Sequence, residues 1–171
     1  EGGVAALGLA SGQGASAYAI QNLCSHGDNF VASSQLYGGT YNQFKNPFSD
    51  MGIEVRFVDP SDPQNFADAT DDRTRAYYGE VLPNPSFQVF PLQEVADIGR
   101  PLGIPLIVDN TAAPLICRPF DHGASIIVHS ATKYIGGHGT SIGGVIVDGG
   151  NFDWEAHPKR QPKLNEPDPN Y

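Results

Sequence analysis

Short apolar runs alternate with amphipathic or polar stretches along most of the chain, and this alternation predicts strands that alternate with helices. The runs with the composition of strands cover residues 4–10, 30–33, 53–58, 76–82, 104–108 and 126–128. Helices are predicted at 15–27, ending at Gly27, at 41–52 with a break at Pro47, and at 91–103, with a short helix near Phe66 inside the polar stretch 59–75. This order favours an α/β fold with a mostly parallel sheet and helices on both faces.

Polar residues follow several of the predicted strands at the point where each strand ends. They include Ser34, Asn84, Asp109 and Ser130. Because the carboxyl ends of parallel strands meet at one edge of a sheet, these residues are expected to gather there. Open α/β sheets bind their ligands at that edge, so it is the predicted site.

The segment after the strand at 126–128 has the composition of an anion site beside an amine. The strand runs into Ser130, Thr132 and Lys133 and then into a glycine cluster at 136–139. Hydroxyl groups and backbone N–H groups in a bend hold phosphate, and a desolvated lysine amine is a nucleophile toward an aldehyde. For an isolated lysine, the alternative is a solvated surface residue.

Asp109 follows the apolar strand 104–108 directly, and a carboxylate there is costly unless it is paired. The partner could be an arginine, a metal ion or a protonated pyridine nitrogen, and the residues alone leave these open. No metal site is predicted, because the five histidines lack the spacing of converging ligands. His129 is predicted to be a core histidine, and Cys24 and Cys117 to be buried thiols without a disulfide.

Gly12 and Gln13 stand at a predicted strand-to-helix junction, where a helix N-terminus can receive a phosphate. Residues 12–17 also fit the G-x-G-x-x-A pattern of dinucleotide-binding proteins. That pattern requires an acid about 20 residues further on, at the end of the next strand. Asp28 precedes the strand at 30–33 instead of following it, so the dinucleotide interpretation is disfavoured.

Composition limits the class of protein. The 171 residues are 40% hydrophobic, which fits one soluble domain with a sizeable core. The formal net charge is −9, from 10 Lys+Arg against 19 Asp+Glu, and this argues against a nucleic-acid partner. No apolar run approaches the roughly 20 residues of a membrane span. The sparse, unpaired cysteines predict a cytoplasmic location.

Residues 129–144, H-S-A-T-K-Y-I-G-G-H-G-T-S-I-G-G, resemble the lysine segment of the Cys/Met metabolism enzymes. These are the cystathionine γ-synthase-like, pyridoxal 5′-phosphate (PLP) enzymes of fold-type I. Residues 139–154 resemble the O-acetylhomoserine sulfhydrylase branch. The resemblance implies that PLP is the cofactor and that Lys133 binds it covalently and is catalytic.

The resemblance also implies roles for other residues. L-Y-G-G-T-Y at 36–41 resembles the segment whose first tyrosine, Tyr37, stacks on the cofactor ring and assists proton transfer. V-D-N-T at 108–111 implies that Asp109 pairs with the ring nitrogen. The remaining implied cofactor-binding residues are Asn84 and Thr111 on the ring-oxygen side, and Gly12, Gln13, Ser130 and Thr132 for the phosphate.

The activity implied by the resemblance is a γ-replacement. O-acetylhomoserine and sulfide or a thiol would give homocysteine and acetate, in a homo-oligomer, a dimer of dimers, whose sites are completed by a neighbouring subunit. A γ-lyase or cystathionine γ-synthase of the same family is an alternative, because the cofactor residues are shared. A non-catalytic, truncated domain that acts only in assembly is an alternative of another class.

The resemblance predicts the domain organisation as well. Residues 1–156 are expected to form the PLP-binding α/β domain, as the central part of a longer enzyme. Residues 157–171 contain Pro158, Pro162, Pro167 and Pro169, and they are predicted to be an extended loop that leads toward a C-terminal region.

Overall fold

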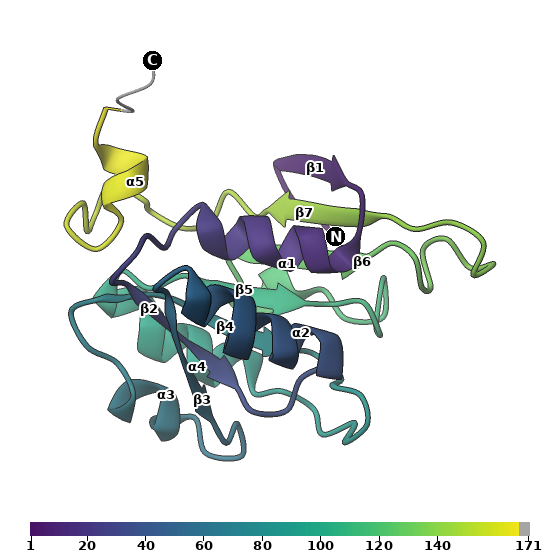
Figure 1. The fold of residues 1–171 in the computed structure, drawn as a ribbon, viewed down its shortest axis with the longest axis horizontal. Helices are drawn as coiled ribbons and strands as arrows, with labels where there is room; N and C mark the ends of the chain where they lie inside the picture. Colours follow the sequence, from purple (N-terminus) through teal and green to yellow (C-terminus); the bar gives the residue numbers. More distant parts are fainter. Residues whose placement is uncertain (168–171) are drawn as a thin grey trace.

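The computed structural model describes residues 1–167 and, within them, contains a sheet of seven strands in the order β1-β7-β6-β5-β4-β2-β3. The strands are β1 (Ala5–Leu9), β2 (Asn29–Ser33), β3 (Glu54–Val58), β4 (Thr74–Glu80), β5 (Leu106–Asp109), β6 (Ile126–Ser130) and β7 (Gly144–Asp148). All neighbours from β3 to β6 pair in parallel, whereas β7 lies antiparallel between β6 and β1 (Figure 1). The predicted α/β class with a mostly parallel sheet is confirmed.

Helices cover both faces of the sheet, as predicted. They are α1 (Gly12–Gln21), α2 (Gly38–Gln43), α3 (Gln64–Asp68), α4 (Leu92–Gly99) and α5 (Pro162–Asn165), with a π-helical turn at Phe44–Phe48 and 3₁₀ turns at Arg100–Leu102 and Pro119–His122. Figure 1 shows α1 and α2 in front of the sheet and α4 behind it. Ile20 and Phe44 pack into one core cluster, and Phe66 and Val95 pack into the other, so the sheet is buried from both sides.

Aromatic side chains fill the core beneath α1 and α2. The ring of Phe44 meets the rings of Phe30 and Tyr78 edge to face, with centroids 4.9 Å and 4.8 Å apart. Tyr78 is fully buried, and its hydroxyl lies 2.8 Å from the Ser16 hydroxyl on α1, so its polar atom is satisfied. Burying such rings contributes about 1.5–3 kcal/mol each.

Two predicted features of the helices need correction. The first helix ends at Gln21 and not at Gly27, because Leu23 and Cys24 both donate to the Ile20 carbonyl and close the chain into turns. Pro47 does not break the second helical segment, since it lies in the π-helical turn that continues α2. A widened turn of this kind accommodates a residue that has no N–H to donate.

Two further elements were not predicted. Strand β7 lies in the segment 139–154, for which the sequence indicated a family resemblance but no strand. It pairs with β6 and with the edge strand β1, and so joins β1 to the sheet. The tail predicted as an extended loop contains the helical turn α5, and residues 168–171 lie outside the described residues. The buried Gln161 ties this tail to the domain through bonds from Nε2 to the carbonyls of Arg75 and Gly103.

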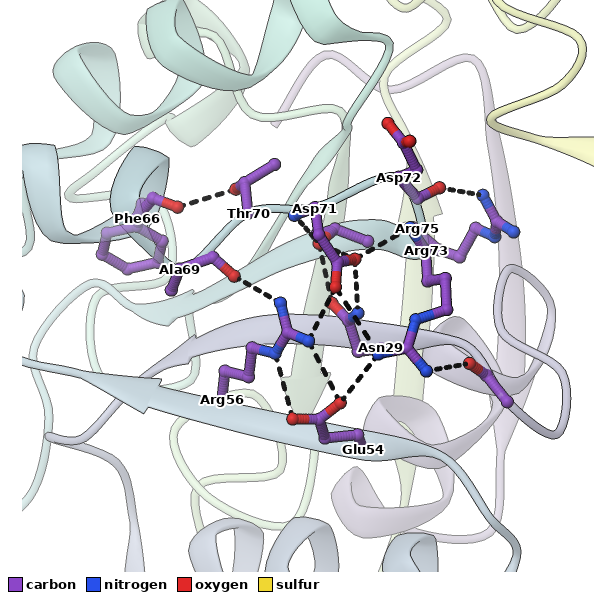
Figure 2. Close-up of polar contacts among 12 residues, drawn as sticks. Asn29, Glu54, Arg56, Phe66, Ala69, Thr70, Asp71, Asp72, Arg73 and Arg75 are labelled. Atoms are coloured by element: carbon purple, nitrogen blue, oxygen red, sulfur yellow. Dashed lines mark hydrogen bonds and ion pairs between the residues drawn. The ribbon is translucent and has the colours of Figure 1, made fainter.

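A network of hydrogen bonds and ion pairs lies at the end of the sheet opposite the predicted site (Figure 2). The Asp71 carboxylate accepts bonds of 2.8 Å from Asn29 Nδ2 and from Arg56 Nη2, and Arg56 also contacts Glu54. These bonds join β2, β3 and the turn that precedes β4. The network therefore holds the start of β4 in register.

We expect Arg75→Met to destabilise the protein by about 3–5 kcal/mol, because Arg75 Nη2 lies 2.7 Å from Asp28 Oδ1 and each side chain is only 12% exposed. Removing one partner leaves a buried charge without compensation. The control is Arg118→Met, since Arg118 and Asp121 form an exposed pair, which contributes about 0–1 kcal/mol. Urea unfolding measures both, and equal effects of the two substitutions would contradict the prediction.

Candidate active site

A cavity of about 750 Å³ opens at the carboxyl edge of β4, β5 and β6. It brings together all nine residues that the sequence predicted for the site: Gly12, Gln13, Tyr37, Asn84, Asp109, Thr111, Ser130, Thr132 and Lys133. These residues come from segments as far apart in the chain as positions 12 and 133. Their common location follows from the topology, and their individual roles stay predictions.

Two carboxyl groups lie side by side on the wall of the cavity. Glu80 at the end of β4 is paired in register with Asp109 at the end of β5, and both residues line the cavity. Burial raises the pKa of Asp109, although Thr111 donates its N–H to Asp109 Oδ1 at 2.8 Å. Burial and the charge of Asp109 together raise the pKa of Glu80 to about 8.

Sequence reasoning missed Glu80. Asp109 was identified as an acid directly after an apolar run, whereas Glu80 lies inside the predicted run 76–82 and becomes the last residue of a strand only in the structure. Glu80 is 6% exposed, and its Oε2 accepts the backbone N–H of Tyr37 at 2.7 Å. It therefore connects the end of β4 to the start of α2.

The N-terminus of α1 forms an anion cradle. Ser11 is the N-cap, and its hydroxyl accepts the Gly14 N–H at 3.0 Å, while the Ala15 N–H bonds to the Ser11 carbonyl. The N–H groups of Gly12 and Gln13 precede the intrahelical bonds, so they are available to an anion at the positive end of the helix dipole. A Cβ at Gly12 would lie 2.5 Å from the Cβ of Ser130, so only glycine permits this close approach.

The topology argues against the dinucleotide alternative. In that fold the strand before the glycine-rich turn pairs in parallel with the strand after the helix. Here β1 pairs only with the antiparallel β7 among the described residues, and β2 lies between β4 and β3. The segment around Gly12 therefore belongs to a different arrangement of strands.

Hydroxyl groups join the loops that follow β5 and β6. Thr111 Oγ1 accepts the Ser130 N–H at 2.7 Å, and its hydroxyl donates to the Asp109 carboxyl group. Thr132 Oγ1 donates to the Gly143 carbonyl at 3.2 Å and accepts the Gly143 N–H at 3.1 Å. Thr132 thus closes the loop that carries Lys133, and a bound phosphate would compete with Gly143 for its hydroxyl hydrogen.

Lys133 lies in a tight turn at the mouth of the cavity. Its N–H bonds to the Ser130 carbonyl at 3.1 Å, and its own carbonyl accepts the Gly137 N–H at 2.8 Å. Gly137 and Gly139 have positive φ angles of 73° and 69°, which glycine adopts without strain. Within residues 1–167, no carboxylate forms an ion pair with the Lys133 amine.

The ring of Tyr37 lies over Gly39. A Cβ at Gly39 would be 2.5 Å from Cε1 of Tyr37 and 2.7 Å from Nε2 of Gln13, so the glycine makes room for both side chains. Tyr37 is 47% exposed and lines the cavity. An open aromatic face there is suited to a flat ligand.

The residues present fit PLP. Asp109 is a carboxylate with a raised pKa that no described cationic side chain pairs, and a protonated ring nitrogen would supply the missing charge. The cradle at Gly12 and Gln13 would hold the phosphate, the face of Tyr37 the ring, and Lys133 the aldehyde carbon. Asn84 and Thr111 would lie on the ring-oxygen side.

Comparisons with known proteins point in the same direction. Residues 1–165 match the model of the Cys/Met metabolism PLP-dependent enzyme family. The chain is 50% identical to an O-acetyl-L-homoserine sulfhydrylase of Leptospira meyeri and 49% identical to a homocysteine/cysteine synthase of Saccharomyces cerevisiae. Both alignments cover 100% of this chain, which spans only 38% and 39% of those two relatives.

Solved structures share the fold. A protein of Campylobacter jejuni that is assigned as an O-acetylhomoserine (thiol)-lyase superimposes with a TM-score of 0.96 at 36% identity, covering 99% of this chain and 42% of that one. That structure contains an N′-pyridoxyl-lysine-5′-monophosphate. An O-acetylhomoserine sulfhydrylase of Wolinella succinogenes superimposes with a TM-score of 0.81 at 37% identity, over 92% of this chain and 46% of that one.

Glu80→Gln should change how the stability of the cofactor-free protein depends on pH. The folded-state pKa of about 8 lies above the ordinary value of 4.5, so the stabilising contribution of this acid is present below 4.5 and is lost as the pH rises through 8. The Gln variant lacks this acid and should therefore lose less stability than the parent over that interval. Urea unfolding at a series of pH values measures the difference.

Asp121→Asn is the control, because Asp121 is an exposed acid on the surface. Its pH profile should follow that of the parent protein. Parallel profiles for the parent and Glu80→Gln would show that Glu80 titrates near its ordinary pKa.

Proposed function

We propose that this chain, which belongs to the Cys/Met metabolism PLP-dependent enzyme family, forms the cofactor site of an O-acetylhomoserine sulfhydrylase. The reaction is the replacement of the acetate group of O-acetylhomoserine by sulfide or a thiol, which gives homocysteine or a related product. The observation that carries this proposal is the gathering of Asp109, Lys133, Tyr37 and the α1 cradle around one cavity. The activities for which these two relatives are named support the choice of substrate.

When bound, PLP supplies a protonated pyridine ring that takes up the electron pair released with the substrate's α proton. Asp109 keeps the proton on the ring nitrogen, because an adjacent carboxylate favours the charged form of that nitrogen. The amine of Lys133 bonds to the cofactor and, once the substrate has displaced it, receives the α proton. Tyr37 holds the ring plane and assists proton transfer near the leaving group.

The surroundings of the cavity support an oligomer, and we propose a homotetramer, a dimer of dimers, in the cytoplasm. Leu115 and Ile116 are 83% and 87% exposed in the loop after β5, and Ile142 is 75% exposed in the loop after β6. Ile142 lines the cavity, and large apolar side chains with this much exposure favour coverage by another protein surface. A neighbouring subunit at this position would complete the site.

The domain organisation is part of the same proposal. Residues 1–156 form the PLP-binding domain as the central part of a longer enzyme, and residues 157–171 lead toward its C-terminal region. The shares of 38% and 39% of the two relatives support this assignment. A γ-lyase or cystathionine γ-synthase activity on the same cofactor residues is the second candidate, and the substrate assay below separates it.

Lys133 is expected to carry the cofactor. Reduction of the full-length enzyme with borohydride converts the bond between lysine and PLP into a stable amine, and peptide mass mapping should then find the pyridoxyl mass on Lys133. Lys133→Arg is the control and should carry no label. A label on Lys45, Lys159 or Lys163 in the parent enzyme would contradict the assignment.

Asp109→Asn should leave the enzyme folded and lower turnover by about 100-fold or more, since an amide does not stabilise a protonated ring nitrogen. Steady-state kinetics and thermal unfolding measure the two effects. Asp121→Asn, an exposed acid outside the cavity, should leave turnover unchanged. Near-normal activity of Asp109→Asn would exclude the role of Asp109 at the ring nitrogen.

The substrate assay tests the proposed function itself. The full-length enzyme receives O-acetylhomoserine, O-succinylhomoserine or O-acetylserine, each with and without sulfide, and in separate reactions methionine or cystathionine. Homocysteine, cysteine and keto acid are quantified in every reaction. We expect homocysteine that depends on sulfide and on the acetyl ester of homoserine. Keto acid released mainly from methionine or cystathionine would identify a lyase, and an enzyme that binds no PLP would support the non-catalytic alternative.

A further inference from the structure

Glu80 lies among the residues assigned to the cofactor, but it has no role in the reaction proposed above. It stands at the end of β4 beside Asp109, and it lines the cavity. Its carboxyl group is almost entirely removed from solvent, with 6% of the residue exposed. A buried acid at this position needs a reason, because burial disfavours its charged form.

The contacts of Glu80 lead to two of the assigned residues. Oε2 accepts the backbone N–H of Tyr37 at 2.7 Å. The backbone N–H of Asn84 also bonds to the carboxyl group and favours its charged form. Tyr37 makes no side-chain cap bond at the start of α2. Among residues 1–167, it is Glu80 at the end of β4 that holds the backbone N–H of Tyr37.

The ring of Tyr37 is placed by the same contact. Its backbone is held by Glu80, and the ring lies over Gly39, where a Cβ would come within 2.5 Å of Cε1. One side of the ring is thus supported by the start of α2. The position of the opposite face of the Tyr37 ring therefore depends on where Glu80 holds the backbone N–H of Tyr37.

We propose that Glu80 is a positioning residue, which sets the plane of the Tyr37 ring and the turn at Asn84 relative to Asp109. The carboxyl group of Glu80, held on the sheet, thereby aligns the Tyr37 ring and Asn84 with the carboxylate of Asp109. These groups correspond to the cofactor's ring face, its ring oxygen and its ring nitrogen. This inference rests on the proposed function, because the alignment matters only for a flat ligand with these three attachment points.

The electrostatics of Glu80 and Asp109 agrees with separate roles for these two acids. Burial and Asp109 raise the pKa of Glu80 to about 8, so Glu80 is mostly neutral at neutral pH. A neutral carboxyl group still accepts backbone N–H bonds, and it adds no second negative charge beside Asp109.

The test compares Glu80→Ala with Glu80→Gln in the full-length enzyme. Gln keeps an oxygen that accepts the Tyr37 N–H, whereas Ala removes it. In the cofactor-free enzyme, hydrogen exchange of the Tyr37 amide should become about tenfold faster in Glu80→Ala and stay near the parent rate in Glu80→Gln. In the PLP-loaded enzyme, the visible circular dichroism per bound cofactor should fall clearly in Glu80→Ala and be largely retained in Glu80→Gln.

Two further variants make the result specific. Asp28→Asn removes the charge of another buried acid at the opposite end of the same sheet, so it should lower stability and leave the circular dichroism unchanged. Gly39→Ala displaces the Tyr37 ring by a different route and should reproduce the circular dichroism change of Glu80→Ala. It also serves as the test if Glu80→Ala does not fold.

Unchanged Tyr37 exchange together with unchanged circular dichroism in Glu80→Ala would overturn the inference. Should that variant not fold, unchanged circular dichroism in Gly39→Ala would do the same. A parent enzyme that binds no PLP would instead refute the proposed function, and the exchange measurement on the cofactor-free enzyme would still decide whether Glu80 holds Tyr37.

Discussion

The parallel, in-register pairing of β4, β5 and β6 is the constraint on which the site depends. It places Glu80 opposite Asp109, and Asp109 opposite Val128, two residues before Ser130. The backbone hydrogen bonds of a sheet define this register, and a slip of one residue would turn each side chain to the other face. The two acids and the lysine loop therefore face one cavity because three buried strands end at the same level.

Close backbone contacts then join the anion cradle to this edge. Gly12 approaches Ser130, and a Cβ at Gly144 would lie 2.0 Å from the carbonyl oxygen of Ser11. The N-terminus of α1 thus rests on the end of β6 and the start of β7. Positive helix dipole, backbone N–H groups and the Ser130 hydroxyl meet at one point, which is the arrangement that binds a phosphate group.

The polar chemistry is divided between the two ends of the sheet. At the end opposite the cavity, acids have their partners: Asp28 pairs with Arg75, and Asp71 pairs with Arg56. At the cavity, Asp109 contacts Thr111 and no cationic side chain among residues 1–167. Paired acids stabilise the fold, whereas a buried acid without a cationic partner is suited to binding a positively charged ligand.

The sequence alone determined the alternation of strands and helices, the strand ends at Asp109 and Ser130, and the lysine segment, because these depend on local hydrophobic periodicity and on short contiguous motifs. It did not reveal that β7 runs antiparallel beside β6, that Pro47 lies inside a continuous helical segment, or that Glu80 contacts Tyr37. Those features depend on contacts between residues far apart in the chain. Register, close glycine contacts and the environment of a buried acid exist only after the strands have packed, so only the tertiary structure decided them.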